Sequence, residues 1–245
     1  MKKIFTVIFF FLISLTIFPQ ADSLKIVAFG NSTTAFRKEV DKVYSVRLQE
    51  KLTKTGICAR VINSGVGGSH TGSVKDNDFV KVKHGMDRFE TDVLNHQPDW
   101  VIINFGLNDA YQDEGIDGKS RIPLVKYREN LEYFIKKIRD QGGDVILLTP
   151  NPLGSRYEQF RKSRVEQYAN CVREIAKEQK VLLVDSWELF SRHAYATNVS
   201  GDIDFLYIDG IHPNDLGHEL IAEALSRLLI DLLGNNSENC RNKAQ

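Results

Sequence analysis

The chain has 245 residues, of which 42% are hydrophobic and 26% are charged. These proportions are typical of a globular protein with a sizeable core and argue against a disordered chain. Lysine and arginine together number 32, as do aspartate and glutamate, so the net charge is zero. A balanced charge gives no overall attraction to nucleic acid or to an anionic membrane surface, and we expect no nucleic-acid partner.

The first 23 residues have the features of a secretory signal peptide. Lys2 and Lys3 precede a mostly apolar stretch over residues 4–18, and Ala21-Asp22-Ser23 supplies the small residues of a cleavage site. The apolar stretch is shorter than the roughly 20 residues that cross a bilayer, which disfavours a membrane anchor. No cysteine directly follows this stretch, which disfavours a lipid anchor. We therefore expect a secreted or periplasmic protein with no stable membrane insertion after cleavage.

Beyond the leader, short runs rich in valine, isoleucine and leucine alternate with longer amphipathic stretches. The short runs predict strands at residues 25–29, 59–62, 100–105, 145–149 and 181–184. The amphipathic stretches predict helices at residues 40–54, 83–96, 124–141, 160–179 and 214–233. Strands that are apolar on both faces are typical of a parallel sheet covered by helices on each side.

The alternation of strand and helix predicts one domain over residues 24–234, followed by a polar tail at 235–245. Its expected fold is a doubly wound, three-layer α/β/α arrangement of flavodoxin-like type around a five-stranded parallel sheet. Ligands of such folds bind beyond the carboxyl ends of the strands. The residues that follow each strand are therefore the ones to examine for function.

Four polar or glycine-bearing segments are expected to meet at that edge. Three of them follow predicted strands and the fourth precedes the last predicted helix; they read Gly30-Asn31-Ser32-Thr33, Asn63-Ser64-Gly65-Val66-Gly67-Gly68, Gly106-Leu107-Asn108-Asp109 and Asp209-Gly210-Ile211-His212-Pro213. In this order they resemble the four blocks of the SGNH/GDSL hydrolase family. The resemblance covers nearly all of the chain after the leader.

A serine, a histidine and an aspartate within these segments predict nucleophilic catalysis. A serine hydroxyl becomes an effective nucleophile when a neighbouring base accepts its proton, and a histidine is suited to this near neutral pH. Ser32 and His212 are the candidates for these roles. Asp209 lies three residues before His212, so its carboxylate can accept a hydrogen bond from Nδ1 and orient the ring.

The family resemblance implies an oxyanion hole made by the backbone N–H groups of Ser32 and Gly68 and the side-chain amide of Asn108. It also implies that the reaction needs no cofactor, and the six histidines show no zinc-binding spacing, so we expect no metal. The first block departs from the family, because Asn31 stands where the usual block has aspartate.

Other residues of these segments receive binding or structural roles. We expect Asn31, His70 and Tyr111 to contact the substrate. Asp109 and His218 are expected to be structural. Asp185 is expected to cap a turn over residues 186–190.

The substrate is expected to be a carbohydrate carrying small acyl esters. Aromatic side chains lie between the polar residues of the predicted loops, and aromatic faces suit sugar rings; they are Tyr111, Tyr157, Phe160, Tyr195, Phe205 and Tyr207. Family members that act on acetylated sugars, together with the predicted export, favour removal of acetyl groups. Two alternatives remain open: a lysophospholipase or thioesterase of the same family, and a non-catalytic glycan-binding module on this scaffold.

Overall fold

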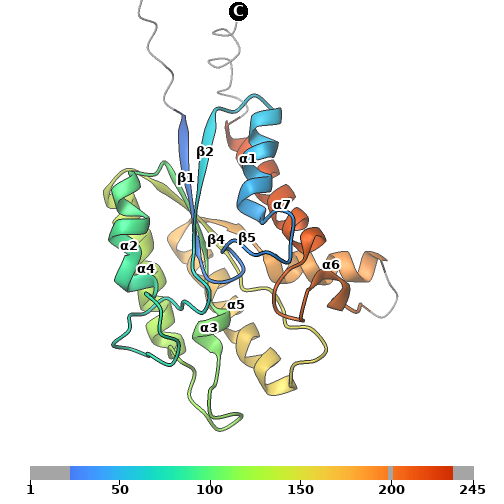
Figure 1. Cartoon of the computed structure of the whole chain (residues 1–245). Helices are drawn as coiled ribbons and strands as arrows, with labels where there is room; N and C mark the ends of the chain where they lie inside the picture. The colour runs from blue at the N-terminus through green and yellow to red at the C-terminus, as the bar shows by residue number, and fades with distance from the viewer. Residues whose placement is uncertain (1–22, 198–200, 234–245) are drawn as a thin grey trace, which may run out of the picture.

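A computed structural model describes residues 23–197 and 201–233, and nearly all of the predicted leader and the predicted tail lie outside them. Five strands form one sheet in the order β2-β1-β3-β4-β5, and every neighbouring pair is parallel (Figure 1). The strands are β1 (Leu24–Gly30), β2 (Ala59–Gly65), β3 (Trp100–Asn104), β4 (Asp144–Leu148) and β5 (Leu182–Val184). The predicted five-stranded parallel sheet is confirmed.

Helices cover both faces of this sheet (Figure 1). One face carries α1 (Tyr44–Lys54), α6 (Ser186–Thr197) and α7 (Asp215–Leu233), and the other carries α2 (Gly85–Asp92), α4 (Leu124–Asp140) and α5 (Gln159–Gln179). The short elements are α3 (Leu107–Ala110), η1 (Leu94–His96) and η2 (Asp204–Leu206). None of the helices in the described ranges is long and apolar enough to cross a membrane.

The two cores follow from the alternation of side chains along each strand. In β3, Val101 and Ile103 pack with α2, α4 and α5, whereas Ile102 packs with α1, α6 and α7. All three side chains are at most 1% exposed, and burying one such side chain contributes about 1.5–3 kcal/mol. The apolar runs of the sequence are therefore needed on both faces of the sheet.

Two predicted helices and one predicted turn differ from the structure. The helix expected at 83–96 ends at Asp92, and the short 3₁₀ helix η1 follows it. The segment before α1 stays irregular up to Val43, because the N–H groups of Asp41 and Lys42 bond to the carboxylate of Asp215 instead of joining a helix. The expected turn at 186–190 is the start of the 12-residue α6. As expected, Asp185 caps it, with its carboxylate accepting the N–H of Glu188 at 3.0 Å.

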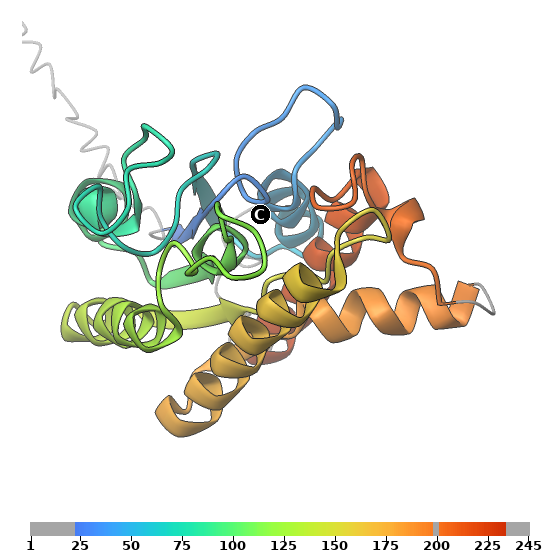
Figure 2. The ribbon, with the colours of Figure 1, turned by 90° about the horizontal axis from the view of Figure 1, so that it is seen from below.

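Every strand ends at the same edge of the sheet, and the irregular loops gather there. Figure 2 views the molecule from this side and shows the loops that follow β1, β2 and β3 close to the segment that precedes α7. The topology thus brings together the four segments that the sequence singles out.

Gly65, at the end of β2, allows one of these loops to pass close to the sheet. A Cβ atom at this position would lie 2.2 Å from the backbone nitrogen of Ala35 and 2.5 Å from the carbonyl carbon of Thr34. Both atoms belong to the segment that follows Ser32. Only a residue without a side chain lets that segment pack against β2.

We predict that Gly65→Ala lowers the free energy of unfolding by about 2–3 kcal/mol, because backbone must move to make room for the methyl group. Urea denaturation measures this change. Gly67→Ala is the matched control, since Gly67 is exposed and has no atom within 4 Å of the added Cβ. Equal unfolding midpoints for the two variants would show that the close approach at Gly65 carries no strain.

Candidate active site

Ser32, His212 and Asp209 form a continuous series of hydrogen bonds. The Nε2 atom of His212 lies 3.0 Å from Oγ of Ser32, and its Nδ1 atom lies 2.7 Å from Oδ2 of Asp209. The two ring nitrogens thus face a hydroxyl on one side and a carboxylate on the other. A ring held in this way is suited to take the serine proton on Nε2 while Nδ1–H stays bonded to the carboxylate.

The tight turn from Asp209 to His212 fixes the direction of the imidazole. Oδ1 of Asp209 accepts the backbone N–H groups of Ile211 and His212, at 3.2 and 2.9 Å. Its Oδ2 atom remains for the ring. Burial raises the pKa of the Asp209 carboxyl, but these hydrogen bonds outweigh it and bring the pKa below its ordinary value. The carboxylate therefore stays ionised at neutral pH.

The loop after β4 is hydrogen-bonded to this turn. The N–H of Gly154 donates to the carbonyl of Gly210 at 2.7 Å, and Nδ2 of Asn151 donates to the carbonyl of Ile211 at 3.1 Å. No sequence motif includes Asn151. Its place two residues after a predicted strand was the available signal, because ligands of such folds bind beyond the carboxyl ends of the strands.

Asn31 lies beside Ser32, but its side chain does not reach the surface. Its side chain is fully buried, and its Oδ1 atom accepts the N–H and the hydroxyl of Thr33, at 2.9 and 2.8 Å. The expected contact with substrate is therefore wrong for Asn31. The amide oxygen instead shapes the turn that presents Ser32, a task that needs an acceptor and no negative charge.

The loop after β2 and the start of α3 carry Gly68 and Asn108, the two residues outside the serine segment that are expected to bind the oxyanion. Gly68 has a φ of +76°, which favours glycine, and a Cβ atom there would lie 2.6 Å from Val80 Cγ1. One N–H of the Asn108 amide donates to the carbonyl of Ser69 at 3.1 Å. A primary amide has two N–H donors, and in the described part of the chain only this one bond from the Asn108 amide is seen.

Arg88 of α2 connects the end of β1, just before Ser32, to the loop that contains Gly68. Its guanidinium donates to the carbonyls of Gly30 and Ser64, each at 2.7 Å, and to the hydroxyl of Ser69 at 3.4 Å. The side chain is 2% exposed and pairs with Asp92 at 3.2 Å. The sequence carries no signal for this role of Arg88, because a single arginine within an amphipathic helix resembles any solvated charge.

Asp109 connects Thr71, in the loop that follows Gly68, to the start of α3. It is fully buried, and its carboxylate accepts the N–H and hydroxyl of Thr71, at 2.8 and 2.6 Å, and the N–H of Gly106 at 3.0 Å. Burial raises its pKa to about 6 in spite of these bonds. The structural role expected for Asp109 agrees with these contacts.

His70 is enclosed by protein and does not line the cleft. Its side chain is fully buried, its ring stacks on that of His84 with the centroids 3.5 Å apart, and its Nε2 atom lies 3.1 Å from the carbonyl of Asn77. The expected contact with substrate is therefore wrong. Nothing in the spacing of a glycine-rich loop reveals which of its side chains point inward.

Tyr111 remains at the surface of the site. Its half-buried ring lies between two guanidinium groups, 4.6 Å from that of Arg121 and 4.4 Å from that of Arg161. It also lines a cavity of about 10 Å³ together with Leu107, Ala110, Leu153, Tyr157, Arg161, Val165 and Ile211. Two of these residues directly precede Asn108 and His212 in the chain. Tyr207, in contrast, is 7% exposed and belongs to the core.

Comparison with known proteins identifies the family. Residues 28–220 match the GDSL-like lipase/acylhydrolase family. The chain belongs to this family. This GDSL-like protein is therefore a carboxylic ester hydrolase, and the family resemblance inferred from its four segments is confirmed.

Curated relatives of this hydrolase include two bacterial proteins. An uncharacterized lipoprotein of Bacillus subtilis, YqeF, is 30% identical over 67% of this chain and 71% of its own length. An acetylxylan esterase of Geobacillus stearothermophilus is 26% identical over 74% of this chain and 75% of its own length.

Solved structures share the same fold. The structure of Axe2, an acetylxylan esterase from Geobacillus stearothermophilus, covers 83% of this chain and 93% of its own, with 25% identity and a TM-score of 0.66. A variant of Axe2, described as an acetyl-xylooligosaccharide esterase, gives the same coverage and TM-score with 26% identity.

We predict that lowering the pH from 7.5 to 5 destabilises the folded hydrolase. Burial lowers the pKa of His70 and of His218 to about 4, so between that value and 6.5 the unfolded chain binds protons that the folded chain does not. The stability present above pH 6.5 is therefore lost as the pH falls, by roughly 2 kcal/mol per histidine at pH 5. Asp109, with its pKa raised to about 6, offsets about 1 kcal/mol of this loss.

Urea denaturation at the two pH values tests this, with His70→Gln as the comparison. The variant should lose roughly 2 kcal/mol less between pH 7.5 and 5 than the unsubstituted protein, whatever its absolute stability. An unchanged pH dependence in His70→Gln would mean that His70 is protonated equally in the folded and unfolded states.

Proposed function

We propose that this protein is an exported serine esterase that removes small acyl groups, chiefly acetyl, from carbohydrate. The observation that carries the proposal is the hydrogen-bonded series from Ser32 through His212 to Asp209, with distances of 3.0 and 2.7 Å. The relatives named as acetylxylan esterases support the choice of an acetylated carbohydrate as substrate.

In this proposal the reaction proceeds through an acyl-enzyme. Oγ of Ser32 attacks the ester carbonyl while Nε2 of His212 takes its proton, and the same proton then passes to the departing alcohol. Water attacks the acyl-serine with His212 again acting as the base, which releases the acid and restores Ser32. Asp209 keeps the ring in the required tautomer and stabilises its positive charge in each step.

The oxyanion formed in both steps needs donors, and three groups are assigned to it. They are the backbone N–H groups of Ser32 and Gly68 and the second N–H of the Asn108 amide. Asp109 and Arg88 hold the surrounding loops together, so these donors are already aligned before the substrate binds. Preorganised donors of this kind typically account for about 10²- to 10³-fold each in rate.

The small cavity between α3, α5 and the His212 turn supports a short acyl group. Its volume of about 10 Å³ has room for about one water molecule, and a methyl group is of similar size. Its apolar lining suits the methyl group of an acetyl ester, and Tyr111 at its border is assigned to substrate binding.

The chain organisation is part of the proposal. Residues 1–23 are assigned as a signal peptide, residues 24–234 as the hydrolase domain and residues 235–245 as a polar tail. An exported enzyme can reach polymeric carbohydrate outside the cell. The YqeF relative is described as a lipoprotein, whereas this chain has no cysteine directly after its apolar leader segment.

We predict that the mature protein releases p-nitrophenol from p-nitrophenyl acetate and acetate from acetylated xylo-oligosaccharides. Ser32→Ala should reduce both rates at least about 10³-fold, because the nucleophile is lost, with the circular dichroism spectrum unchanged. A folded Ser32→Ala variant that keeps most of its activity would exclude Ser32 as the nucleophile.

Faster release from lysophospholipids or thioesters than from acetylated sugars would favour the alternative esterases. Glycan binding without turnover would favour a binding module.

We also predict that Leu153→Ala changes the preferred acyl length. Removing the Leu153 side chain enlarges the cavity, so the ratio of activity on p-nitrophenyl butyrate to activity on the acetate should rise about tenfold or more. Val172→Ala is a control, because Val172 is buried in the same core but does not line the cavity. If both variants show the same ratio of butyrate to acetate activity, the cavity does not select the length of the acyl group.

A further inference from the structure

The nucleophile and the base are carried by two irregular segments that no strand pairing joins. Ser32 lies in the segment between β1 and α1, and His212 lies in the turn that precedes α7. The 3.0 Å contact between their side chains therefore depends on how the segment at residues 31–43 is held against the start of α7.

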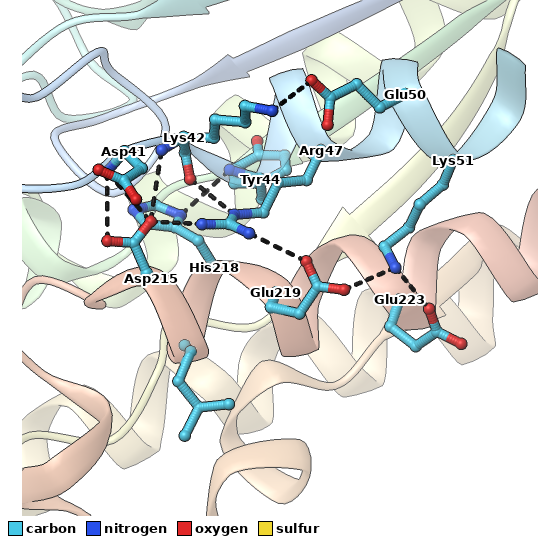
Figure 3. Close-up of polar contacts among 12 residues, drawn as sticks. Asp41, Lys42, Tyr44, Arg47, Glu50, Lys51, Asp215, His218, Glu219 and Glu223 are labelled. Atoms are coloured by element: carbon cyan, nitrogen blue, oxygen red, sulfur yellow. Dashed lines mark hydrogen bonds and ion pairs between the residues drawn. The ribbon is translucent and has the colours of Figure 1, made fainter. Parts of the chain in front are cut away.

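Asp215 makes this connection. It is the first residue of α7 and lies three positions after His212. Its Oδ1 atom accepts the backbone N–H groups of Asp41 and Lys42, at 3.1 and 3.3 Å, and Oδ2 lies 3.2 Å from the N–H of Asp41 (Figure 3). A single carboxylate thus joins the nucleophile segment to the helix that follows the base.

Arg47 of α1 completes the arrangement. Its guanidinium donates to the Asp215 carboxylate and, at 3.2 Å, to Glu219, and its Nε–H donates to the carbonyl of Lys42 at 2.8 Å (Figure 3). Burial raises the pKa of the Asp215 carboxyl, but the N–H groups and the guanidinium outweigh it, so the pKa lies below its ordinary value. The carboxylate is therefore ionised and able to accept these bonds at neutral pH.

A second contact, one helical turn further along α7, also links this helix to the segment that contains Ser32. The Nδ1 atom of His218 accepts the N–H of Tyr44 at 3.2 Å, and the Tyr44 hydroxyl lies 3.1 Å from that of Thr34. His218, Tyr44 and Thr34 are all fully buried. Thr34 is two residues from Ser32, so this series also connects α7 with the nucleophile turn.

We propose that Asp215 is a positioning residue for the esterase reaction, which sets the distance between Ser32 and His212 by binding the backbone of residues 41 and 42. This inference rests on the proposed function. A misplacement of reacting groups by about 1 Å costs on the order of 10²-fold in rate, so loss of this contact should slow catalysis more than it weakens substrate binding.

The chain contains a matched control on the same two helices. Glu223 of α7 pairs with Lys51 of α1 at 2.8 Å, so it also links α7 to α1 (Figure 3). Its described contacts do not include residues 41 and 42. Removing Glu223 therefore removes an ion pair between the helices without freeing the nucleophile segment.

The test compares Asp215→Ala, Asp215→Asn and Glu223→Ala by their kcat and KM on p-nitrophenyl acetate and by the rate at which a fluorophosphonate labels Ser32. We expect Asp215→Ala to lose about 10- to 100-fold in kcat and in labelling rate, with KM changed less than threefold. Asp215→Asn keeps the oxygen that accepts both N–H groups and should stay within about threefold of the unsubstituted protein. Glu223→Ala should react at the unsubstituted rate.

Several outcomes would overturn the proposal. Asp215→Ala within threefold in both measurements would do so, as would an equal loss in Asp215→Asn, since that would assign the effect to the ion pair with Arg47. If Asp215→Ala does not fold, Asp215→Ser takes its place with the same expectations. Failure of the proposed function is distinguishable, because then the unsubstituted protein itself neither hydrolyses the ester nor labels at Ser32.

Discussion

The hydrogen bond between Ser32 and His212 joins residues 180 positions apart in the chain. Its existence depends on a parallel sheet, in which every strand delivers its carboxyl end to the same edge. Loops after β1, β2 and β3 and the turn before α7 therefore converge without any special local sequence that draws them together. The topology brings the segments of the site together, and local residues hold them in position.

Buried polar groups hold the segments of the site in position. Arg88 fixes the loop of Ser32 to the loop of Gly68, Asp109 fixes the loop of Gly68 to α3, and Asn151 supports the turn of His212. Each is at most 3% exposed, so its bonds are protected from competition with water. The candidate site thus consists of a few polar groups near the surface and a larger set of enclosed groups that hold their loops in place.

The sequence predicted the sheet and the four site segments because both depend on short-range patterns. Runs such as Val101–Ile103 are typical of strands that are buried on both faces, and polar residues such as Ser32 lie within a few positions of such runs. The direction of loop side chains follows no such period. A contact with substrate is therefore the expectation for His70 and Asn31, although both side chains are fully buried.

Long-range polar contacts were also beyond the reach of the sequence. Arg47 and Asp215 are 168 positions apart, and each lies in an amphipathic helix among many other charges. Only the packing of α1 beside α7 selects this pair from the alternatives (Figure 3). The late start of α1 has the same origin, because Asp41 and Lys42 find their acceptor on another helix.

Asn31 gives the nucleophile turn a property that the usual aspartate would not. An amide does not titrate, so its oxygen remains an acceptor for Thr33 in acid conditions that would protonate a carboxylate. It also leaves no formal negative charge next to the serine, where an anionic tetrahedral species would be repelled by one. The hydrogen bonds between Asn31 and Thr33 are thereby independent of acidity, and titratable groups elsewhere in the molecule set the acid limit of the enzyme.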